Sequence, residues 1–221
     1  MTAQTWTTIA DLATALGTLV LAIATFSAIR SANLSARIAQ RALLEGMRPV
    51  LMPSKRDDAA LKVNFGDSKF VLVPGGGAAG EVGGGDGSLG SDDPVYLAVG
   101  LRNAGNGIAV LHGWHFYPEW HRDDEHAPLE EFRRQTRDLY IPVGDVGFWQ
   151  GAFRVASEPQ YEAARKVIEA REPWTVELLY GDHEGGQRVI SKFTMLARHD
   201  SENGWFASVS RHWNIDRPDP R

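Results

Sequence analysis

The spacing of apolar and polar residues divides the chain into an N-terminal helical segment and a longer segment with the period of β-strands. The run LATALGTLVLAIATFSAI, residues 12–29, contains no charged residue. As a helix it would be about 27 Å long, close to the hydrocarbon thickness of a bilayer. Since no Lys or Arg precedes the run, a membrane-spanning helix is favoured over a secretory signal peptide. A helix packed in the core of a soluble protein is the alternative for this segment.

The helical pattern continues beyond the apolar run. The segment SANLSARIAQRALLEG is rich in helix formers, contains no Pro, and ends with Gly46 in the position of a C-terminal cap. We therefore expect residues 1–48 to form a membrane-spanning and juxtamembrane helix. Four arginines on one side of this helix are expected to lie at the membrane surface, although a solvated polar face explains them equally well: Arg30, Arg37, Arg41 and Arg48. All of them follow the apolar run, so the positive-inside bias predicts an N-terminus outside and a cytoplasmic main domain.

A stripe of mostly small residues follows the same helix with an unbroken 4-3 spacing from residue 11 to residue 43. Small side chains let membrane helices approach one another closely, and this period is that of a left-handed coiled coil. The stripe is compatible with a homo-oligomer formed through the helix, and the alternative is that an Ala/Thr-rich segment gives such a stripe by composition alone. Its members are Asp11, Ala15, Thr18, Ala22, Thr25, Ile29, Ala32, Ala36, Ala39 and Leu43.

Residues 49–221 have the texture of a β-rich domain. In VYLAVGLRN apolar residues alternate along the segment, and the turn NAGNG and a further apolar segment follow, which predicts a hairpin of strands 95–103 and 108–117. A second hairpin is predicted from WTVELLY and RVISKFTML. Further strands are expected at 50–52, 61–65, 70–73, 139–143, 147–155 and 205–209, and one helix at 158–172. The predicted fold is a transmembrane helix followed by a mainly antiparallel β-domain, either a β-sandwich or a partly open barrel, with one helix.

The segment PGGGAAGEVGGGDGSLGS, residues 74–91, contains nine Gly. No Lys-Ser or Lys-Thr follows it and no strand-to-helix context surrounds it, so neither a P-loop nor a dinucleotide fingerprint is supported. We expect a flexible loop between two strands.

Composition limits the chemistry. The 221 residues include no Cys, which excludes thiolate catalysis and a disulfide framework. The net charge is −5 for the chain, and residues 49–221 carry 19 basic and 26 acidic residues, or −7. Because nucleic-acid binding needs a basic patch, no nucleic-acid partner is expected.

Two groups of residues are candidates for chemistry. Four histidines, His112, His115, His121 and His126, lie close together in sequence, but on a regular strand the first two point to opposite faces, so no metal site is expected. The turn residues Asp182, His183 and Glu184 are weak candidates for a hydrolase site, yet neighbouring turn residues rarely converge on one reacting atom. No cofactor is expected.

Aromatic residues next to hydrogen-bonding groups give a candidate binding surface, made of Trp149, Gln150, Arg211, His212 and Trp213. The main hypothesis is a membrane-anchored, non-enzymatic protein that binds an unknown protein or small molecule. A membrane-tethered hydrolase using the 182–184 turn and a soluble protein with a packed N-terminal helix are the alternatives.

Several segments together resemble a family: WTTIADLATALGTLVLAIATFSAIRSAN, RALLEGMRPVLMPS, YLAVGLRNAGNGIAVLHGW, RDLYIPVGDVGFWQGAFR, LLYGDHEGGQR and RHWNIDRPDPR. They are similar to uncharacterised, single-pass membrane-anchored proteins of actinobacteria over nearly the whole chain. The resemblance implies a bacterial source and an anchor in the inner membrane, and it carries no catalytic residues.

Overall fold

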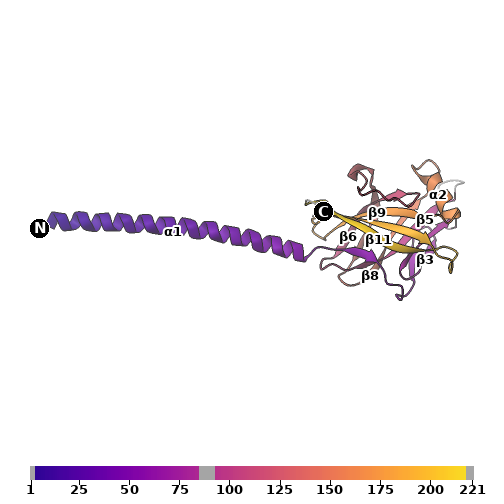
Figure 1. The fold of residues 1–221 in the computed structure, drawn as a ribbon, viewed down its shortest axis with the longest axis horizontal. Coiled ribbons are helices and arrows are strands. Elements are labelled where there is room, and N and C mark those ends of the chain that lie inside the picture. The colour runs from indigo at the N-terminus through magenta and orange to yellow at the C-terminus, as the bar shows by residue number, and fades with distance from the viewer. Residues whose placement is uncertain (1–2, 85–92, 218–221) are drawn as a thin grey trace. The chain divides into compact units, whose positions relative to one another are not determined.

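A computed structural model describes residues 3–84 and 93–217. They form two compact units, residues 1–45 and 46–221 (Figure 1). The elements are α1 (Ala3–Gly46), β1 (Leu51–Pro53), β2 (Leu61–Asn64), β3 (Phe70–Val73), β4 (Gly77–Val82), β5 (Val95–Asn103), β6 (Ala109–Tyr117), a 3-10 turn (Leu129–Glu131), β7 (Arg133–Ile141), β8 (Val146–Phe153), α2 (Tyr161–Glu169), β9 (Trp174–Gly181), β10 (Val189–Ala197) and β11 (Gly204–Asn214). The predicted fold class, one long apolar helix and an antiparallel β-domain with one further helix, is confirmed.

The first unit is the single helix α1. Among the described residues, one helix is long and apolar enough to cross a membrane, and none of its apolar window is buried. The hydroxyl groups of Thr14, Thr18, Thr25 and Ser27 donate to main-chain carbonyls of the preceding turn at 2.7–3.1 Å. The polar groups in the apolar run are thus satisfied inside the helix, as a hydrocarbon environment requires.

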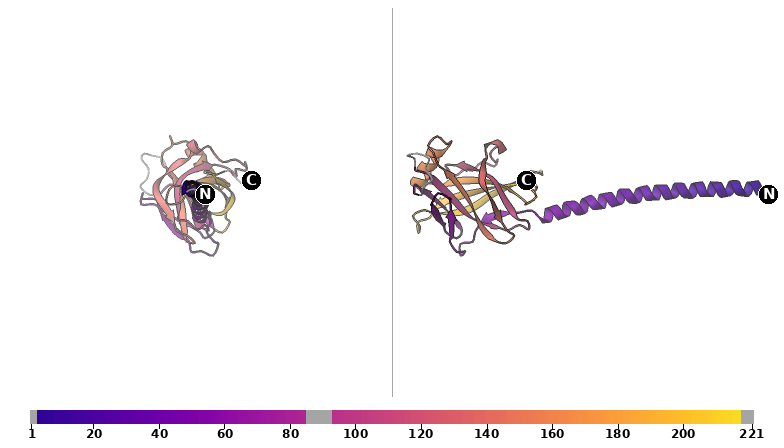
Figure 2. Two further views of the ribbon diagram at one scale, coloured as in Figure 1. Left: turned by 90° about the vertical axis from the view of Figure 1, so that its left-hand side faces the viewer. Right: turned by 180° about the vertical axis from the view of Figure 1, so that it is seen from behind.

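The second unit is built on one curled antiparallel sheet. Its strands follow the order β1-β5-β4-β11-β10-β9-β6-β7, and β8 pairs with the other edge of β5. β1 and β4 share one edge of β5, at Leu101–Asn103 and at Val95–Val99. Views from the end and from behind show the strands wrapping around a common interior (Figure 2). The sheet is therefore a half-barrel whose two ends are β7 and β8.

The interior of the half-barrel is aromatic. Trp114 packs edge-on against Trp149 and Phe153 at ring-centroid distances of 5.3 and 5.5 Å, and Trp174 packs against Trp205 at 6.2 Å. The buried side of α2 joins the same core through Tyr161, Ala164, Val167 and Ile168. The β2–β3 hairpin covers a smaller apolar cluster that includes Tyr96 and Ala98 of β5. The two clusters lie on opposite faces of β5, since its side chains alternate.

The prediction of a flexible loop at 74–91 is wrong for residues 77–82, which form the strand β4 between β11 and β5. Small residues are required there. A Cβ on Gly77 would lie 2.4 Å from the Trp205 carbonyl oxygen, and one on Gly80 would lie 2.6 Å from Ile168 Cδ1. The glycines that look like a linker in the sequence therefore permit close packing of the strand. Residues 85–91 of the predicted loop lie outside the described residues.

The predicted hairpin of 95–103 and 108–117 is also wrong, although both strands exist. β5 pairs with β1, β4 and β8, whereas β6 pairs with β7 and β9. The connection turns across the half-barrel around the buried amide of Asn103. Its Nδ2 donates to the carbonyls of Gly107 and Ile141 at 2.6 and 3.0 Å, and its Oδ1 accepts from Gly105 N at 3.0 Å. These bonds direct the turn away from the hairpin geometry that its glycines suggest.

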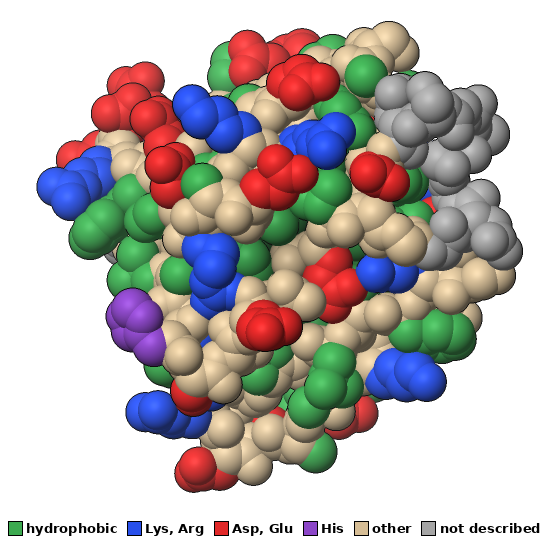
Figure 3. All heavy atoms as spheres, turned by 90° about the vertical axis from the view of Figure 1, so that its right-hand side faces the viewer, with side chains coloured by type: hydrophobic (Ala, Val, Ile, Leu, Met, Phe, Trp, Pro, Cys, Tyr) green, Lys and Arg blue, Asp and Glu red, His purple; other side chains and the backbone are tan. Residues whose placement is uncertain are grey.

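The remaining predicted elements are present, with shifted ends. The β9–β10 hairpin pairs as expected. β7 begins six residues earlier than the predicted strand 139–143, and the helix predicted at 158–172 is shortened to Tyr161–Glu169. On one face of the β-domain, acidic and basic side chains alternate around small apolar areas (Figure 3).

Candidate functional site at the open seam

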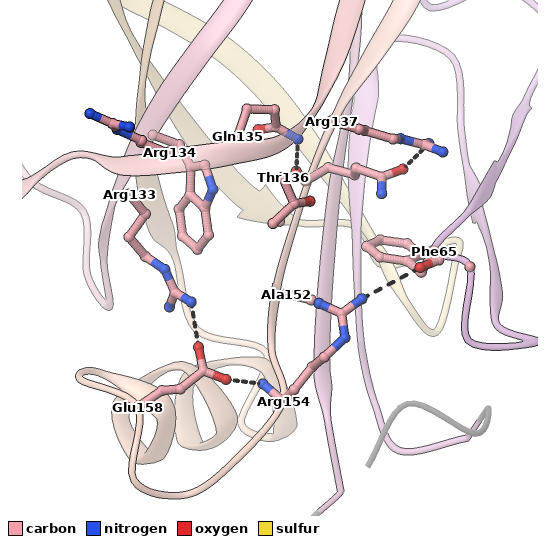
Figure 4. A pocket seen from close by; sticks show the side chains of 13 residues that line it. Phe65, Arg133, Arg134, Gln135, Thr136, Arg137, Ala152, Arg154 and Glu158 are labelled. Carbon is pink, nitrogen blue, oxygen red and sulfur yellow. Dashed lines mark hydrogen bonds and ion pairs between the residues drawn. The ribbon is translucent and has the colours of Figure 1, made fainter. Parts of the chain in front are cut away.

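The two ends of the half-barrel meet without a backbone ladder. Among the described strands, β7 is hydrogen-bonded only to β6, and β8 only to β5. Between β7 and β8 lies a pocket of about 310 Å³, which we call the seam pocket (Figure 4). It is lined by Phe65, Gly66, Trp114, Arg133, Arg134, Gln135, Thr136, Arg137, Gln150, Gly151, Ala152, Arg154 and Glu158.

Side chains replace the missing ladder at the upper end of the pocket. The Gln135 amide nitrogen donates to the Gln150 carbonyl at 2.9 Å, and Arg137 Nη2 donates to Gln150 Oε1 at 2.6 Å. Arg137 Nη2 also reaches the Asn64 carbonyl at 3.2 Å. Since the bonds from Gln135 and Arg137 both end on Gln150, this residue holds the two strand edges together.

Arg133 forms one wall of the seam pocket. Its guanidinium is paired with Glu158 and lies 4.7 and 4.6 Å from the ring centroids of Trp114 and Phe153. Its Nη1 is buried and has no hydrogen-bond partner among the described residues. Burial alone would raise the pKa of Glu158, but hydrogen bonds from the Arg154 N–H and from Arg133 outweigh it and hold that pKa below its usual value. Glu158 is therefore ionised at neutral pH.

Arg154 forms the opposite wall and holds the tip of the β2–β3 hairpin. Its Nε and Nη2 donate to the Asp67 carboxylate at 3.1 and 3.2 Å, and Nη2 also reaches the Phe65 carbonyl at 3.4 Å. The Tyr96 hydroxyl donates to the same carboxylate at 3.1 Å. In Figure 4 the Arg154 and Arg133 guanidinium groups lie on either side of the pocket, whereas Arg134 extends away from both.

The balance of charge in the pocket is positive. Four arginines and one glutamate line the pocket, and the carboxylate of Asp67 is paired with Arg154. The formal charge of these six side chains is +2. Nη1 of Arg154 and Nη1 of Arg137 take part in no hydrogen bond within the described part of the chain. Guanidinium donors bind carboxylates and phosphates strongly. The seam pocket can therefore bind a small anion, although the domain around it is acidic.

The structure separates the five residues of the predicted aromatic binding surface. Gln150 lines the seam pocket, but Trp149 is fully buried in the core beside Trp114. Arg211 and Trp213 lie under the chain segment 118–128, where Arg211 pairs with Asp124 at 2.6 Å and Trp213 Nε1 donates to the Asp124 carbonyl at 3.2 Å.

His212, the fifth of these residues, joins a buried hydrogen-bonded chain. Its Nδ1 lies 2.6 Å from Ser191 Oγ, which lies 2.8 Å from the Tyr180 hydroxyl. Burial raises the pKa of Tyr180 to about 12, so its hydroxyl stays protonated. Ser191 is fully buried and is therefore not an accessible nucleophile.

Segment 118–128 also covers a buried ion pair. Lys192 Nζ lies 3.3 Å from Glu177 Oε1, a contact without hydrogen-bond geometry, and donates to the carbonyls of Asp123 and Glu125 at 2.7 and 3.2 Å. Glu177 Oε2 accepts from Ala127 N at 2.8 Å. Both charged side chains are at least 98% buried. The pair fixes the segment to the outer face of the sheet.

The turn predicted as a weak hydrolase candidate does not bring its three groups together. Asp182 is buried, and its Oδ1 accepts from the backbone N–H groups of Glu184 and Gly186 at 3.0 and 2.9 Å. The side chains of His183 and Glu184 are exposed. The Asp182 carboxylate therefore shapes the turn, as Asp side chains commonly do.

The four neighbouring histidines do not converge on one site, although His115 and His121 both pack against the Tyr117 ring. His112 occupies a bulge in β6, and burial, together with the charge of Arg188, lowers its pKa. His115 Nδ1 lies 3.3 Å from the Glu131 carbonyl, His121 stacks on Tyr117 at 3.8 Å, and His126 packs against Trp213. In the residues that the structure describes, no group of three or more His, Asp or Glu side chains is arranged to hold a metal ion.

Of the four predicted membrane-surface arginines, Arg30, Arg37 and Arg41 are exposed on α1. Arg48 differs from the prediction, because it follows the end of α1 and belongs to the β-domain. Its guanidinium donates to Asn214 Oδ1 at 2.6 Å and to Gln187 Oε1 at 3.2 Å.

The sequence interpretation missed most of the seam pocket. The sequence signal for this pocket is the segment RRQTR, residues 133–137. It contains three arginines within five residues, although the domain to which it belongs is acidic overall. Comparisons with known protein families, curated proteins and solved structures found no match to this chain.

Proposed function

We propose that this chain is a single-pass membrane protein whose β-domain binds a small anionic ligand in the seam pocket and catalyses no reaction on it. The observation that carries the proposal is the pair of available guanidinium nitrogens, Nη1 of Arg137 and of Arg154, in a pocket of net positive charge. Carboxylates and phosphates are the chemical groups that such donors recognise. No nucleic acid is proposed as a partner, because the domain is acidic overall.

The proposed location is the inner membrane of a bacterium, with the N-terminus outside and the β-domain in the cytoplasm. The cations beyond the apolar run support this orientation, since Arg30, Arg37 and Arg41 all follow it and no Lys or Arg precedes it. The exposed small residues of the stripe between residues 11 and 43 support a homo-oligomer through α1.

Fractionation tests the anchor. We expect full-length protein to stay in carbonate-washed membranes and its β-domain to resist protease added outside spheroplasts, whereas a chain that starts at residue 49 is soluble. Release of the full-length chain by carbonate would overturn the membrane proposal. Cleavage of the domain by external protease would overturn the proposed orientation and leave the membrane anchor unaffected.

Ligand-observed NMR with the full chain in lipid nanodiscs tests anion binding, with acetate and inorganic phosphate as probes. We expect binding that weakens with added salt, and Arg137→Gln and Arg154→Gln should each weaken it by about tenfold, since a hydrogen bond to a charged group contributes about 1.5 kcal/mol or more. Arg122→Gln is the matched control, because Arg122 is exposed and lines no part of the pocket. Equal binding by all four proteins would refute the proposed site.

A further inference from the structure

A second pocket, of about 480 Å³, adjoins the seam pocket, and we call it the apolar pocket. It is lined by His115, Phe116, Glu131, Arg133, Glu158, Pro159 and Gln160. Arg133 and Glu158 belong to both linings, so their ion pair stands between the two pockets. Ligand cavities in proteins commonly span this range of sizes and combine an apolar wall with a few polar groups.

The two pockets differ in chemistry. Most of the wall of the apolar pocket is apolar, with the exposed Pro159 among its residues, and the fully buried Phe116 lies behind this lining. Its charged groups are Glu131, Glu158 and Arg133, a balance of −1. The seam pocket has a balance of +2 when Asp67 is included. An anionic group is therefore attracted to the seam pocket and repelled from the apolar pocket.

We infer that the ligand is an anionic amphiphile, with a carboxylate or phosphate head in the seam pocket and a single apolar tail in the apolar pocket. The inference rests on the proposed function, because the head uses the Arg137 and Arg154 donors described above. The Arg133 guanidinium lies on the rings of Trp114 and Phe153, with Nη1 buried. The tail passes between the two pockets beside the Arg133–Glu158 ion pair, where the methylene groups of the Arg133 side chain offer apolar contact.

The opposite charges of the pockets set the direction of binding. A ligand with the head in the apolar pocket would place its negative group beside the two carboxylates of Glu131 and Glu158 and would leave the seam arginines without an anion. Like charges close together in a partly buried site repel each other, which weakens binding in this direction. Uncharged amphiphiles of the same length lack the head interaction and should bind more weakly.

The experiment is a chain-length series of n-alkanoates from acetate to octanoate, titrated by ligand-observed NMR into full-length protein in phosphatidylcholine nanodiscs, with empty nanodiscs subtracted. Each methylene that enters the apolar pocket should strengthen binding by up to about fourfold. Octanol should bind more weakly than octanoate. Arg137→Gln should weaken every alkanoate by a similar factor, since it removes contacts to the head alone.

Pro159→Glu tests the tail site. This residue is exposed, so the variant is expected to fold, and the added carboxylate should abolish the gain with chain length while leaving acetate binding close to that of the wild type. Pro142→Glu is the matched control, because Pro142 is an exposed proline in the β7–β8 turn and lines neither pocket. It should retain the whole chain-length dependence.

Each outcome separates the two proposals. Arginine-dependent binding of acetate and octanoate with equal affinity would overturn the amphiphile and leave the anion site intact. Chain-length dependence that is shared by octanol and unaffected by Arg137→Gln would overturn both. Nanodiscs doped with lysophosphatidic acid, a membrane lipid with one acyl chain, distinguish the source of the head: weaker octanoate binding indicates competition from a membrane lipid, and unchanged binding indicates a free amphiphile.

Discussion

Removal of one partner of the buried Glu177–Lys192 pair should destabilise the β-domain strongly. In Lys192→Met the Glu177 carboxylate would stay in the interior without a compensating cation, with the Ala127 N–H, 2.8 Å away, and the Tyr117 hydroxyl as donors. The carbonyls of Asp123 and Glu125 would lose the Lys192 ammonium that they accept from. The change thus leaves an uncompensated buried charge and loosens segment 118–128.

The expected magnitude follows from the burial of both groups. Breaking a buried ion pair by removing one partner costs about 3–5 kcal/mol, whereas removing both partners can be nearly neutral. Here the double variant Glu177→Met with Lys192→Met still leaves the Ala127 N–H without its acceptor, which costs about 2 kcal/mol. We therefore expect each single change to lower the unfolding free energy more than the double change does.

The assay is chemical denaturation of the full chain in detergent micelles, followed by tryptophan fluorescence. Six of the seven Trp residues lie in the β-domain, so the signal reports mainly on this unit. The four proteins of the double-mutant cycle give the coupling free energy between the two side chains. Lys166→Met is the matched control, because Lys166 is an exposed lysine of α2, and it should change stability by less than about 0.5 kcal/mol.

Additivity would refute the reasoning. If the double variant lost the sum of the two single losses to within about 0.5 kcal/mol, the two charges would not stabilise each other. A small loss for Lys192→Met alone would mean that water or a rearranged segment 118–128 solvates Glu177. In that case the segment would not depend on the ion pair for its position.

Three further changes test the fold. Gly80→Val should cost about 1–3 kcal/mol by overpacking, because a Cβ there would lie 2.6 Å from Ile168 Cδ1; denaturant titration measures the loss. Asn103→Ala should cost about 3 kcal/mol in the same assay, because buried backbone groups lose their partners. Burial and the charge of Arg188 lower the pKa of His112 in the folded protein, so the unfolded chain binds a proton at higher pH and the wild type loses stability below about pH 6.5. His112→Gln should flatten this loss, which stability profiles from pH 5 to 8 measure.

Contrary results would have definite meanings. A Gly80→Val chain as stable as the wild type would show that β4 and α2 separate without cost. Asn103→Ala with a loss below about 0.5 kcal/mol would mean that water replaces the amide. An unchanged pH profile in His112→Gln would place the imidazole in solvent, and a steeper one would reverse the sign of its pKa shift.

Local patterns in the sequence were sufficient for α1 and for most of the strands. The uncharged run from residue 12 to residue 29 encodes a helix by its own backbone bonds, and alternation in VYLAVGLRN encodes the strand β5. Both signals act between neighbouring residues. The hydrogen bonds of a helix and the alternation along one strand do not depend on which partner packs against them, so these elements follow from the local sequence.

The candidate site depends on residues that are distant in the chain. Arg137 and Arg154 lie on opposite sides of the β7–β8 turn, and the tip of the β2–β3 hairpin, with Asp67, joins them from a third segment. Alternation alone would place each arginine on a strand face, but it does not show which strands are neighbours. Only the order of the strands brings these groups around one pocket.

The sequence by itself determined the membrane-compatible helix, the antiparallel class and the period of the strands, because hydrophobic spacing acts over a few residues. The tertiary structure decided that glycines 77 and 80 belong to a central strand, that Asn103 turns the chain across the half-barrel, and that β7 meets β8 without a ladder. Those features depend on the curl of the whole sheet and on backbone contacts between distant segments, which no local pattern contains.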